Sequence, residues 1–328
     1  MRKVLVTGAT GRLGGNVVAS LKQRGHDVRC LVTEEDPKRE KVERLGCEVF
    51  SGSLTQPERL RAAVKGVKGV VHLAAIMEEV PKGMTHLEFF DINTRGTFIL
   101  MDAACEEVVE KFVYTSSTAA YDIFTARHVP VREDSPLLPR SEYGITKVAS
   151  EAILMAMSFR YDLPLVILRP SYIMACEEVF ALGKLWNTII GLKAAAQPWC
   201  AFHVPGLGEP WTDLERQASE NPDLNYIPYG PNGLPWHWHV TDVRDATKAV
   251  LLALDSDQVT RDILNIAGPR PTCFEEAVTY KCRKLGAPYE KISTPVYWRL
   301  EFDISKAQKV LGYKPEFDVI RMIDDALA

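Results

Sequence analysis

The sequence predicts an α/β protein with a doubly wound parallel sheet and a smaller C-terminal cap. Three observations support this fold class. Short apolar runs alternate with segments of helical periodicity over the first half of the chain. A glycine turn joins the first apolar run directly to the first helical segment. After residue 170 the alternation stops, and residues 176–238 contain five of the six tryptophans.

The elements of the first half can be taken in order. Residues 2–6 form an apolar, β-branched run that is typical of a buried strand. The spacing of Leu13, Val17 and Leu21 predicts a helix directly after it. Further strands are expected at 27–32, 47–50, 69–73, 111–115 and 165–168, and helices within 34–44 and at 57–64, 87–108 and 142–161. Because helices between parallel strands form right-handed crossovers, residues 1–170 are expected to build one Rossmann-type domain.

The chain beyond residue 170 is expected to be organised differently. The many prolines and tryptophans of 176–238 indicate a compact cap over the sheet. Regular elements return as a helix at 242–254, a strand at 263–267 and a helix at 274–285. We therefore expect 171–328 to form a substrate-binding region, in which 239–270 returns to the edge of the sheet.

The composition argues against several classes of protein. A formal net charge of −4 offers no basic surface for nucleic acid. No apolar run reaches the roughly 18 residues of a membrane span, and the immediate first strand leaves no place for a signal peptide. Seven scattered cysteines without a C-x-x-C pair indicate reduced thiols in a cytoplasmic protein. The histidines show no ligand spacing beyond His237-x-His239, so no metal site is expected.

The glycine turn contains the first candidate binding residues. Gly8, Gly11 and Gly14 stand between a strand and a helix. Such a turn leaves unpaired N–H groups at the helix N-terminus, which attract a pyrophosphate, and glycine permits its close approach. The spacing is G-x-x-G-x-x-G and not the G-x-G-x-x-G of the dinucleotide fingerprint. An ordinary strand-to-helix turn is the alternative, but the strand before and the helix after favour a dinucleotide site.

A second group of residues carries acid–base chemistry. Tyr143 and Lys147 are four residues apart, so on a helix they lie on one face. A nearby ammonium lowers the pKa of a phenol from its usual value of about 10. Ser116 and Ser117 follow the strand at 111–115, at the edge where ligands bind in such sheets. A solvated helix face and a serine turn are the alternatives; the combination favours a serine that polarises a carbonyl and a tyrosine that exchanges its proton.

Several motifs then occur in a characteristic order. They are Gly8/Gly11/Gly14, Val70-Val71-His72-Leu73-Ala74-Ala75, Asn93-x-x-Gly96-Thr97, Tyr114-Thr115-Ser116-Ser117, Tyr143-x-x-x-Lys147 and Leu168-Arg169-Pro170. As an ordered set, they resemble the extended short-chain dehydrogenases/reductases, the NAD-dependent epimerase/dehydratase group. The resemblance covers most of the first 170 residues, together with 239–243 and 303–313.

This resemblance implies an NAD(P)-dependent oxidoreductase or epimerase. Tyr143 would be the acid/base, Lys147 would hold the nicotinamide ribose and lower the tyrosine pKa, and Ser117 would polarise the substrate carbonyl. Hydride would move between a secondary alcohol or ketone carbon and the nicotinamide. It also implies a homodimer formed through the helices near 87–108 and 142–161. The implied cofactor-binding residues are Gly8, Thr10, Gly11, Arg12, Leu13, Gly14, Thr33, Ser53, Leu54, Leu73, Ala74, Ala75, Asn93, Thr115, Tyr143, Lys147, Pro170 and Ile173.

Two departures from the family pattern affect the cofactor. An NAD enzyme of this family would usually end its second strand with an acidic residue for the adenosine ribose, and this chain has Thr33 there, followed by Glu34 and Glu35. The basic residues Arg12, Lys38 and Arg39 could meet a 2′-phosphate, which favours NADP slightly over NAD. In addition, Ser53 replaces the family's aspartate for the adenine amine.

A third departure affects the substrate. Enzymes of this family that act on nucleotide sugars tend to have an asparagine-containing turn after Arg-Pro and an arginine shortly before the segment 239–243. This chain has 171–174 (SYIM) and 234–238 (LPWHW) at those places, so the paired cations for a diphosphate are missing. Thr118 also replaces the acid of the family's dehydratases.

A small, non-nucleotide substrate held by apolar contacts is therefore expected. Trp236 and Trp238 are the candidates for the pocket wall, and the other cap tryptophans are core residues in the simplest interpretation. Two alternatives stay open. One is a nucleotide-sugar epimerase or dehydratase with a divergent clamp, and the other is a non-catalytic regulatory protein that senses NAD(P).

Overall fold

The computed structural model describes residues 2–77, 80–122, 129–184, 206, 208–209, 211–221 and 223–328. Two of the tryptophans expected in the cap, Trp186 and Trp199, lie outside these residues. Within the described ranges, no helix has both the length and the apolar character that crossing a bilayer demands.

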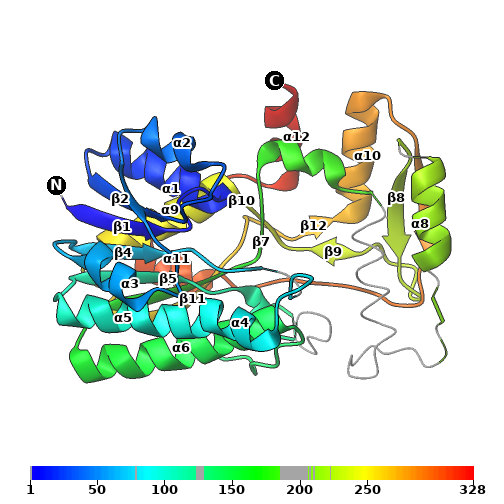
Figure 1. Ribbon diagram of the computed structural model, residues 1–328. Coiled ribbons are helices and arrows are strands. Elements are labelled where there is room, and N and C mark those ends of the chain that lie inside the picture. The colour runs from blue at the N-terminus through cyan, green and yellow to red at the C-terminus, as the bar shows by residue number, and fades with distance from the viewer. Residues whose placement is uncertain are drawn as a thin grey trace.

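A seven-stranded parallel sheet forms the centre of the protein (Figure 1). Its strands are β1 (Lys3–Thr7), β2 (Asp27–Val32), β3 (Glu48–Ser51), β4 (Gly69–His72), β5 (Lys111–Thr115), β6 (Leu165–Pro170) and β11 (Arg261–Ile266). Their order is β11-β6-β5-β4-β1-β2-β3, and every pair is parallel. The predicted doubly wound, Rossmann-type sheet is confirmed. Its strand order reverses between β1 and β4, and in sheets of this type ligands bind at the carboxyl ends of the strands at that point.

Helices cover both faces of this sheet (Figure 1). One face packs against α1 (Arg12–Gln23), α9 (Val243–Asp255) and α11 (Ser305–Leu311), and the other against α3 (Pro57–Val64), α5 (Gly96–Glu106) and α6 (Glu142–Tyr161). The residues of β1 alternate between the two cores, with Val4 and Val6 in the first and Leu5 in the second. Because both faces are covered, the strand is apolar throughout, as the sequence suggested.

Two expected helices can be compared with the structure in detail. The helix expected at 87–108 consists of α4 (His86–Phe90), a π-helical turn at Asp91–Arg95 and α5 in direct succession. The helix expected within 34–44, after Pro37, is α2 (Arg39–Glu43). A turn precedes it, in which Asp36 N–H donates to the Thr33 carbonyl oxygen and the Asp36 carboxylate accepts from the N–H of Lys38.

Among its described residues, the C-terminal part contains three two-stranded sheets. They pair β7 (Tyr172–Met174) with β10 (Val240–Asp242), β9 (His237–Trp238) with β12 (Thr272–Cys273), and β8 (Asn225–Tyr229) with β13 (Tyr289–Ser293). Helices α8 (Trp211–Glu220), α10 (Phe274–Leu285) and α12 (Val319–Leu327) and the 3-10 turn at Cys176–Ala181 surround them. Each sheet joins segments that are distant in sequence, so this part is held together by non-local contacts.

A buried lysine ties these segments together. The ammonium of Lys281, on α10, donates to the carbonyl oxygens of Phe180 and Leu182 and to Asn225 Oδ1, 2.7 Å away. Burial lowers the pKa of Lys281 to about 8, so the ammonium form depends on these three acceptors. The cap is therefore anchored by polar groups as well as by its apolar core.

The glycine turn gives a stability prediction with an internal control. A Cβ at Gly14 would lie 1.9 Å from the Gly8 carbonyl oxygen, whereas a Cβ at Gly15 would come no closer than 3.9 Å to Ala9 O. We expect Gly14→Ala to lower the free energy of unfolding by about 1–3 kcal/mol, because the α1–β1 contact must open. Gly15→Ala should be neutral or stabilising by up to about 1 kcal/mol. Equal urea midpoints for the two variants would contradict this account.

Candidate active site

The start of helix α6 is pressed against the turn that follows β5. The Ser141 hydroxyl caps the helix by accepting from Gly144 N–H at 3.1 Å. A Cβ at Gly144 would lie 2.3 Å from the Ala119 carbonyl oxygen, so only glycine permits this close approach. Ala119 belongs to the turn directly after Ser117, which places Tyr143 of the first helical turn beside Ser117.

Lys147 lies one helical turn further along. Its ammonium donates to the carbonyl oxygen of Thr115 at 2.8 Å, and lies 5.4 Å from the ring centroid of Tyr143 and 4.7 Å from that of Tyr114. The structure thus brings Ser117, Tyr143 and Lys147 together at the carboxyl end of β5. The Thr115 hydroxyl is buried without a hydrogen-bond partner in the described part of the chain.

Burial dominates the electrostatics of this group. It raises the pKa of Tyr143 to about 12, against a smaller opposing effect of the Ser117 hydroxyl. It also lowers the pKa of Lys147 to about 7, although Glu151 favours the charged lysine. The expected lowering of the tyrosine pKa by Lys147 is therefore not found, because the same burial that isolates the phenol also discourages the ammonium.

A buried polar network lies beneath this group. Arg169, in β6, binds both carboxylate oxygens of Glu151, in α6, at 2.9 and 2.5 Å, and the two side chains are 2% and 3% exposed. Glu151 also accepts from the Ser116 hydroxyl at 2.5 Å, and Arg169 donates to Tyr121 Oη at 2.6 Å. Sequence reasoning quoted Ser116 and Arg169 only as parts of motifs and did not find Glu151. The spacing of four residues after Lys147 is the signal that could have found it.

The glycine turn packs tightly against the end of β4. Gly8 has a positive φ of 69°, and a Cβ there would lie 2.8 Å from the Ala74 nitrogen. Gly11 N–H donates to the Gly8 carbonyl oxygen at 3.1 Å. The turn therefore packs directly on the end of β4 and forms the N-terminus of α1, a position that attracts anions.

Both ends of this turn make long-range contacts. Arg12 donates to the Ile173 carbonyl oxygen at 2.9 Å and pairs with Glu178. The Thr10 hydroxyl donates to the Asp36 carboxylate at 2.6 Å. Asp36 was not predicted from the sequence, because the family pattern places the acid at the end of β2, where this chain has Thr33. The only sequence signal for Asp36 is its position three residues after Thr33, in the same loop.

Asn93 and His72 hold the segment after β4. The Asn93 side chain, in the π-helical turn, accepts from Ile76 N–H at 2.8 Å and donates to Ile76 O at 2.9 Å. The ring of His72 bonds the hydroxyls of Thr7 and Thr97 at 2.6 and 2.8 Å, and burial lowers its pKa to about 3. His72 is thus a neutral structural link between β1, β4 and α5.

The remaining predicted cofactor residues lie at the same edge of the sheet. Thr33 follows β2, Ser53 and Leu54 follow β3, Leu73, Ala74 and Ala75 follow β4, Pro170 ends β6, and Ile173 lies in β7. Ser53 bonds locally, through its N–H to Gln56 and through its hydroxyl to Thr55. Leu54 is buried against Gly96. All of these residues therefore border the carboxyl ends of the strands.

Trp236 does not line an open pocket as the sequence analysis expected. It is fully buried, and its indole N–H donates to Thr294 Oγ1 and to the Val296 carbonyl oxygen at 3.1 and 3.0 Å. Trp238 is 9% exposed and contacts Tyr172, which is 37% exposed. Trp236 therefore belongs to the core, and Tyr172 is the most exposed of these rings.

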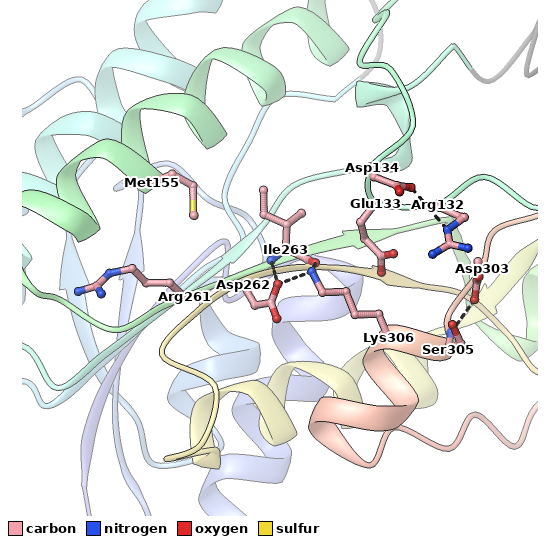
Figure 2. A pocket seen from close by; sticks show the side chains of 10 residues that line it. All are labelled: Arg132, Glu133, Asp134, Met155, Arg261, Asp262, Ile263, Asp303, Ser305 and Lys306. Carbon is pink, nitrogen blue, oxygen red and sulfur yellow. Dashed lines mark hydrogen bonds and ion pairs between the residues drawn. The ribbon is translucent and has the colours of Figure 1, made fainter.

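A separate cavity of about 490 Å³ lies along the outer edge of β11 (Figure 2). Charged side chains line it, and Ser117, Tyr143 and Lys147 are not among them. Glu133 accepts from the backbone N–H of Asn265 at 2.8 Å, and Lys306 donates to the carbonyl oxygen of Ile263 at 3.0 Å and pairs with Asp262. Its charges are thus directed at the backbone of the edge strand.

Comparisons with known proteins identify the family of this chain. A sequence model of the NAD dependent epimerase/dehydratase family matches residues 4–214. The UDP-glucose 4-epimerase of Lacticaseibacillus casei is 26% identical over 98% of this chain and 94% of its own length. Sterol demethylase protein B of Methylococcus capsulatus is 34% identical, over 52% of this chain and 51% of its own length.

A solved structure of a short-chain dehydrogenase/reductase superfamily protein from Agrobacterium tumefaciens, with bound NAD, is also similar. It shares 27% identity and a TM-score of 0.81, over 99% of this chain and 95% of that one. The family predicted from the sequence is confirmed. The chain belongs to the NAD-dependent epimerase/dehydratase family, whose members are NAD-dependent oxidoreductases and epimerases.

Proposed function

We propose that this protein transfers a hydride between NAD(P) and a secondary alcohol or ketone carbon of a small, non-nucleotide substrate. The reaction is an oxidation, a reduction or an epimerisation. The proposal rests chiefly on one observation, the convergence of Ser117, Tyr143 and Lys147 between the end of β5 and the start of α6. Because all three residues are retained, we favour an enzyme over a non-catalytic sensor of NAD(P).

Each residue of this group has a distinct role in the proposal. The Ser117 hydroxyl donates a hydrogen bond to the substrate oxygen. Tyr143, whose pKa is raised to about 12, is protonated at neutral pH and can deliver its proton to a ketone oxygen. In the reverse direction the tyrosine must accept a proton, and a charged Lys147, held by the Thr115 carbonyl oxygen, would stabilise the phenolate.

The glycine turn and its surroundings fit the cofactor. Gly8 and Gly14 let helix α1 begin in direct contact with the backbone at the ends of β1 and β4, and the first N–H groups of that helix would receive the pyrophosphate. The buried Thr115 hydroxyl, which lacks a partner in the described part of the chain, fits a polar group of the nicotinamide half. When bound, the cofactor supplies or accepts the hydride. The proposed contact residues are those that the family resemblance implies, from Gly8 to Ile173.

We further propose that the cofactor is NAD, the reverse of the slight preference for NADP drawn from the sequence. Two of the cations counted for NADP have acidic partners: Arg12 pairs with Glu178, and Arg39 with Glu43. The Asp36 carboxylate is bonded to Thr10 within the glycine turn, where it would accept from ribose hydroxyls and repel a 2′-phosphate. The similar Agrobacterium protein has NAD bound.

A nucleotide-sugar epimerase is the second candidate. The near full-length similarity to the L. casei UDP-glucose 4-epimerase favours it. Against it, the segment 171–174 lacks the asparagine and the segment 234–238 lacks the arginine that this group of enzymes tends to have there. The nearby Arg299 is paired with Glu301 at 2.8 Å. The partial similarity to sterol demethylase protein B supports an apolar substrate.

A homodimer is part of the proposal. Leu87, Phe98 and Ile145 are 69%, 42% and 53% exposed, on the adjoining helices α4, α5 and α6. Exposed large apolar side chains on neighbouring helices support the proposed interface. The described cysteines are free, which supports the predicted cytoplasmic location.

The proposed acid/base can be tested on any alcohol, ketone or sugar that the wild type converts. Tyr143→Phe removes the proton and keeps the ring, so turnover should fall by about 10²–10⁴-fold. The dissociation constant of NAD should change by less than threefold, which corresponds to a change in binding free energy of less than roughly 0.6 kcal/mol. Tyr161→Phe, at the exposed end of the same helix, is the control. Undiminished turnover in Tyr143→Phe would remove this residue from the mechanism.

The choice of cofactor depends on Asp36 in this proposal. Asp36→Asn removes the charge that faces a 2′-phosphate, so the ratio of NADP to NAD affinity should rise at least tenfold, about 1.4 kcal/mol. Calorimetric titration of each cofactor measures this ratio. Glu35→Gln removes an exposed acid one residue away and should leave the ratio unchanged. A wild type that prefers NADP would refute the proposal.

The oligomeric state provides a separate test. Phe98→Asp places a charge on α5 and should convert a dimer into a monomer in analytical ultracentrifugation. Leu285→Asp, on the exposed surface of α10, should stay dimeric. A wild-type protein that sediments as a monomer at micromolar concentration would contradict the proposed interface.

A further inference from the structure

We infer that Tyr172 is the wall against which a flat, uncharged carbocyclic ring of the substrate packs, with Trp238, Trp298 and Trp236 supporting it from behind. These four residues are called the aromatic stack. The inference names a substrate class for the site proposed above, and it rests on that proposed function.

The aromatic stack is ordered from the surface to the core. The ring centroids of Tyr172 and Trp238 are 4.6 Å apart, and those of Trp238 and Trp298 are 5.6 Å apart, with interplanar angles of 32° and 33°. Trp236 meets Trp298 edge-on at 5.6 Å. Exposure falls along this series, from 37% for Tyr172 to 9%, 5% and 0% for Trp238, Trp298 and Trp236. The exposed member therefore rests on a layered aromatic support.

The base of the stack is held rigidly. The indole N–H of Trp236 has two acceptors, Thr294 Oγ1 and Val296 O. Trp238 lies in β9, which pairs with β12, and the neighbouring His237 pairs with Arg299 in an isolated β-bridge. Backbone hydrogen bonds join His237 to both Trp298 and Leu300. A wall fixed in this way loses little conformational entropy when it receives a ligand.

The chain places Tyr172 next to the proposed reaction site. It begins β7 two residues after Pro170, the last residue of β6. Its neighbour Ser171 bonds Thr241 at 2.6 Å, and its other neighbour Ile173 accepts from Arg12 of the glycine turn at 2.9 Å. Tyr172 therefore stands between the carboxyl end of the sheet and the cofactor turn.

The tyrosine ring at position 172 indicates which class of ligand fits this place. Nucleotide-sugar enzymes of the family tend to carry asparagine in this turn, whose amide bonds polar groups, whereas tyrosine presents a ring face. A ring face gains most from another flat ring, through apolar burial and offset stacking. The nearby guanidinium of Arg299 is neutralised by Glu301, so the surroundings offer little to a diphosphate.

Binding of 2-acetonaphthone to the NAD-loaded protein tests this inference, with quenching of tryptophan fluorescence as the readout. The ketone carries a flat carbocyclic ring beside a carbonyl. We expect Tyr172→Asn to weaken its binding at least tenfold, and Tyr172→Phe, which keeps the ring, to bind it within threefold of the wild type. Tyr289→Asn makes the same change at a tyrosine that is 44% exposed on β13, and should have no effect.

Three results would overturn the inference. They are equal affinity of Tyr172→Asn and the wild type, an equal loss in Tyr289→Asn, and tighter binding of uridine diphosphate than of the ketone by the wild type. If Tyr172→Asn fails to bind NAD or to unfold cooperatively, Tyr172→Leu replaces it, with the same tenfold loss expected. Because this readout needs no turnover, it can be repeated in Tyr143→Phe protein, so failure of the proposed chemistry and failure of the ring wall are separable.

Discussion

The buried ion pair between Glu151 and Arg169 holds helix α6 against the sheet, and the candidate active site depends on that attachment. Tyr143, Lys147 and Glu151 are spaced by four residues, so they form one stripe along the helix. With Glu151 fixed to β6, the other two must face the end of β5. A buried pair of this kind costs about 3–5 kcal/mol when one partner is removed, because the other charge is left without compensation.

The same attachment explains why the pKa values of Tyr143 and Lys147 shift in directions that oppose a phenolate beside an ammonium. A helix held so closely to the sheet buries Lys147, which is 2% exposed, and leaves Tyr143 only partly exposed. Their pKa values then move toward the uncharged forms, to about 12 for Tyr143 and about 7 for Lys147. The geometry that brings the two groups together thus also opposes the phenolate. In the proposed mechanism, this favours proton donation by Tyr143 to a ketone over the reverse step.

The features that could be predicted from the sequence are those that depend on the spacing of neighbouring residues. The glycine turn, the i, i+4 pair and the alternation of strands and helices depend on neighbouring residues, and the fold and the grouping of Ser117, Tyr143 and Lys147 followed from them. The Thr10–Asp36 contact joins the glycine turn to the loop after β2, and the spacing of neighbouring residues does not predict it. The pKa of Tyr143 depends on burial by segments far apart in sequence. Trp236 and Trp238 are two residues apart in sequence. Only their tertiary contacts leave Trp236 fully buried and Trp238 9% exposed.

The charged cavity beside β11 has a consequence for how copies of the protein can meet. An edge strand with free N–H and C=O groups is a template for pairing with another chain. Here Glu133 and Lys306 already occupy backbone groups of Asn265 and Ile263, and the approach is lined with charges (Figure 2). In the described part of β11, another strand would find these two backbone groups already bonded and would have to displace charged side chains. Extension of the sheet by strand pairing is therefore disfavoured at this edge.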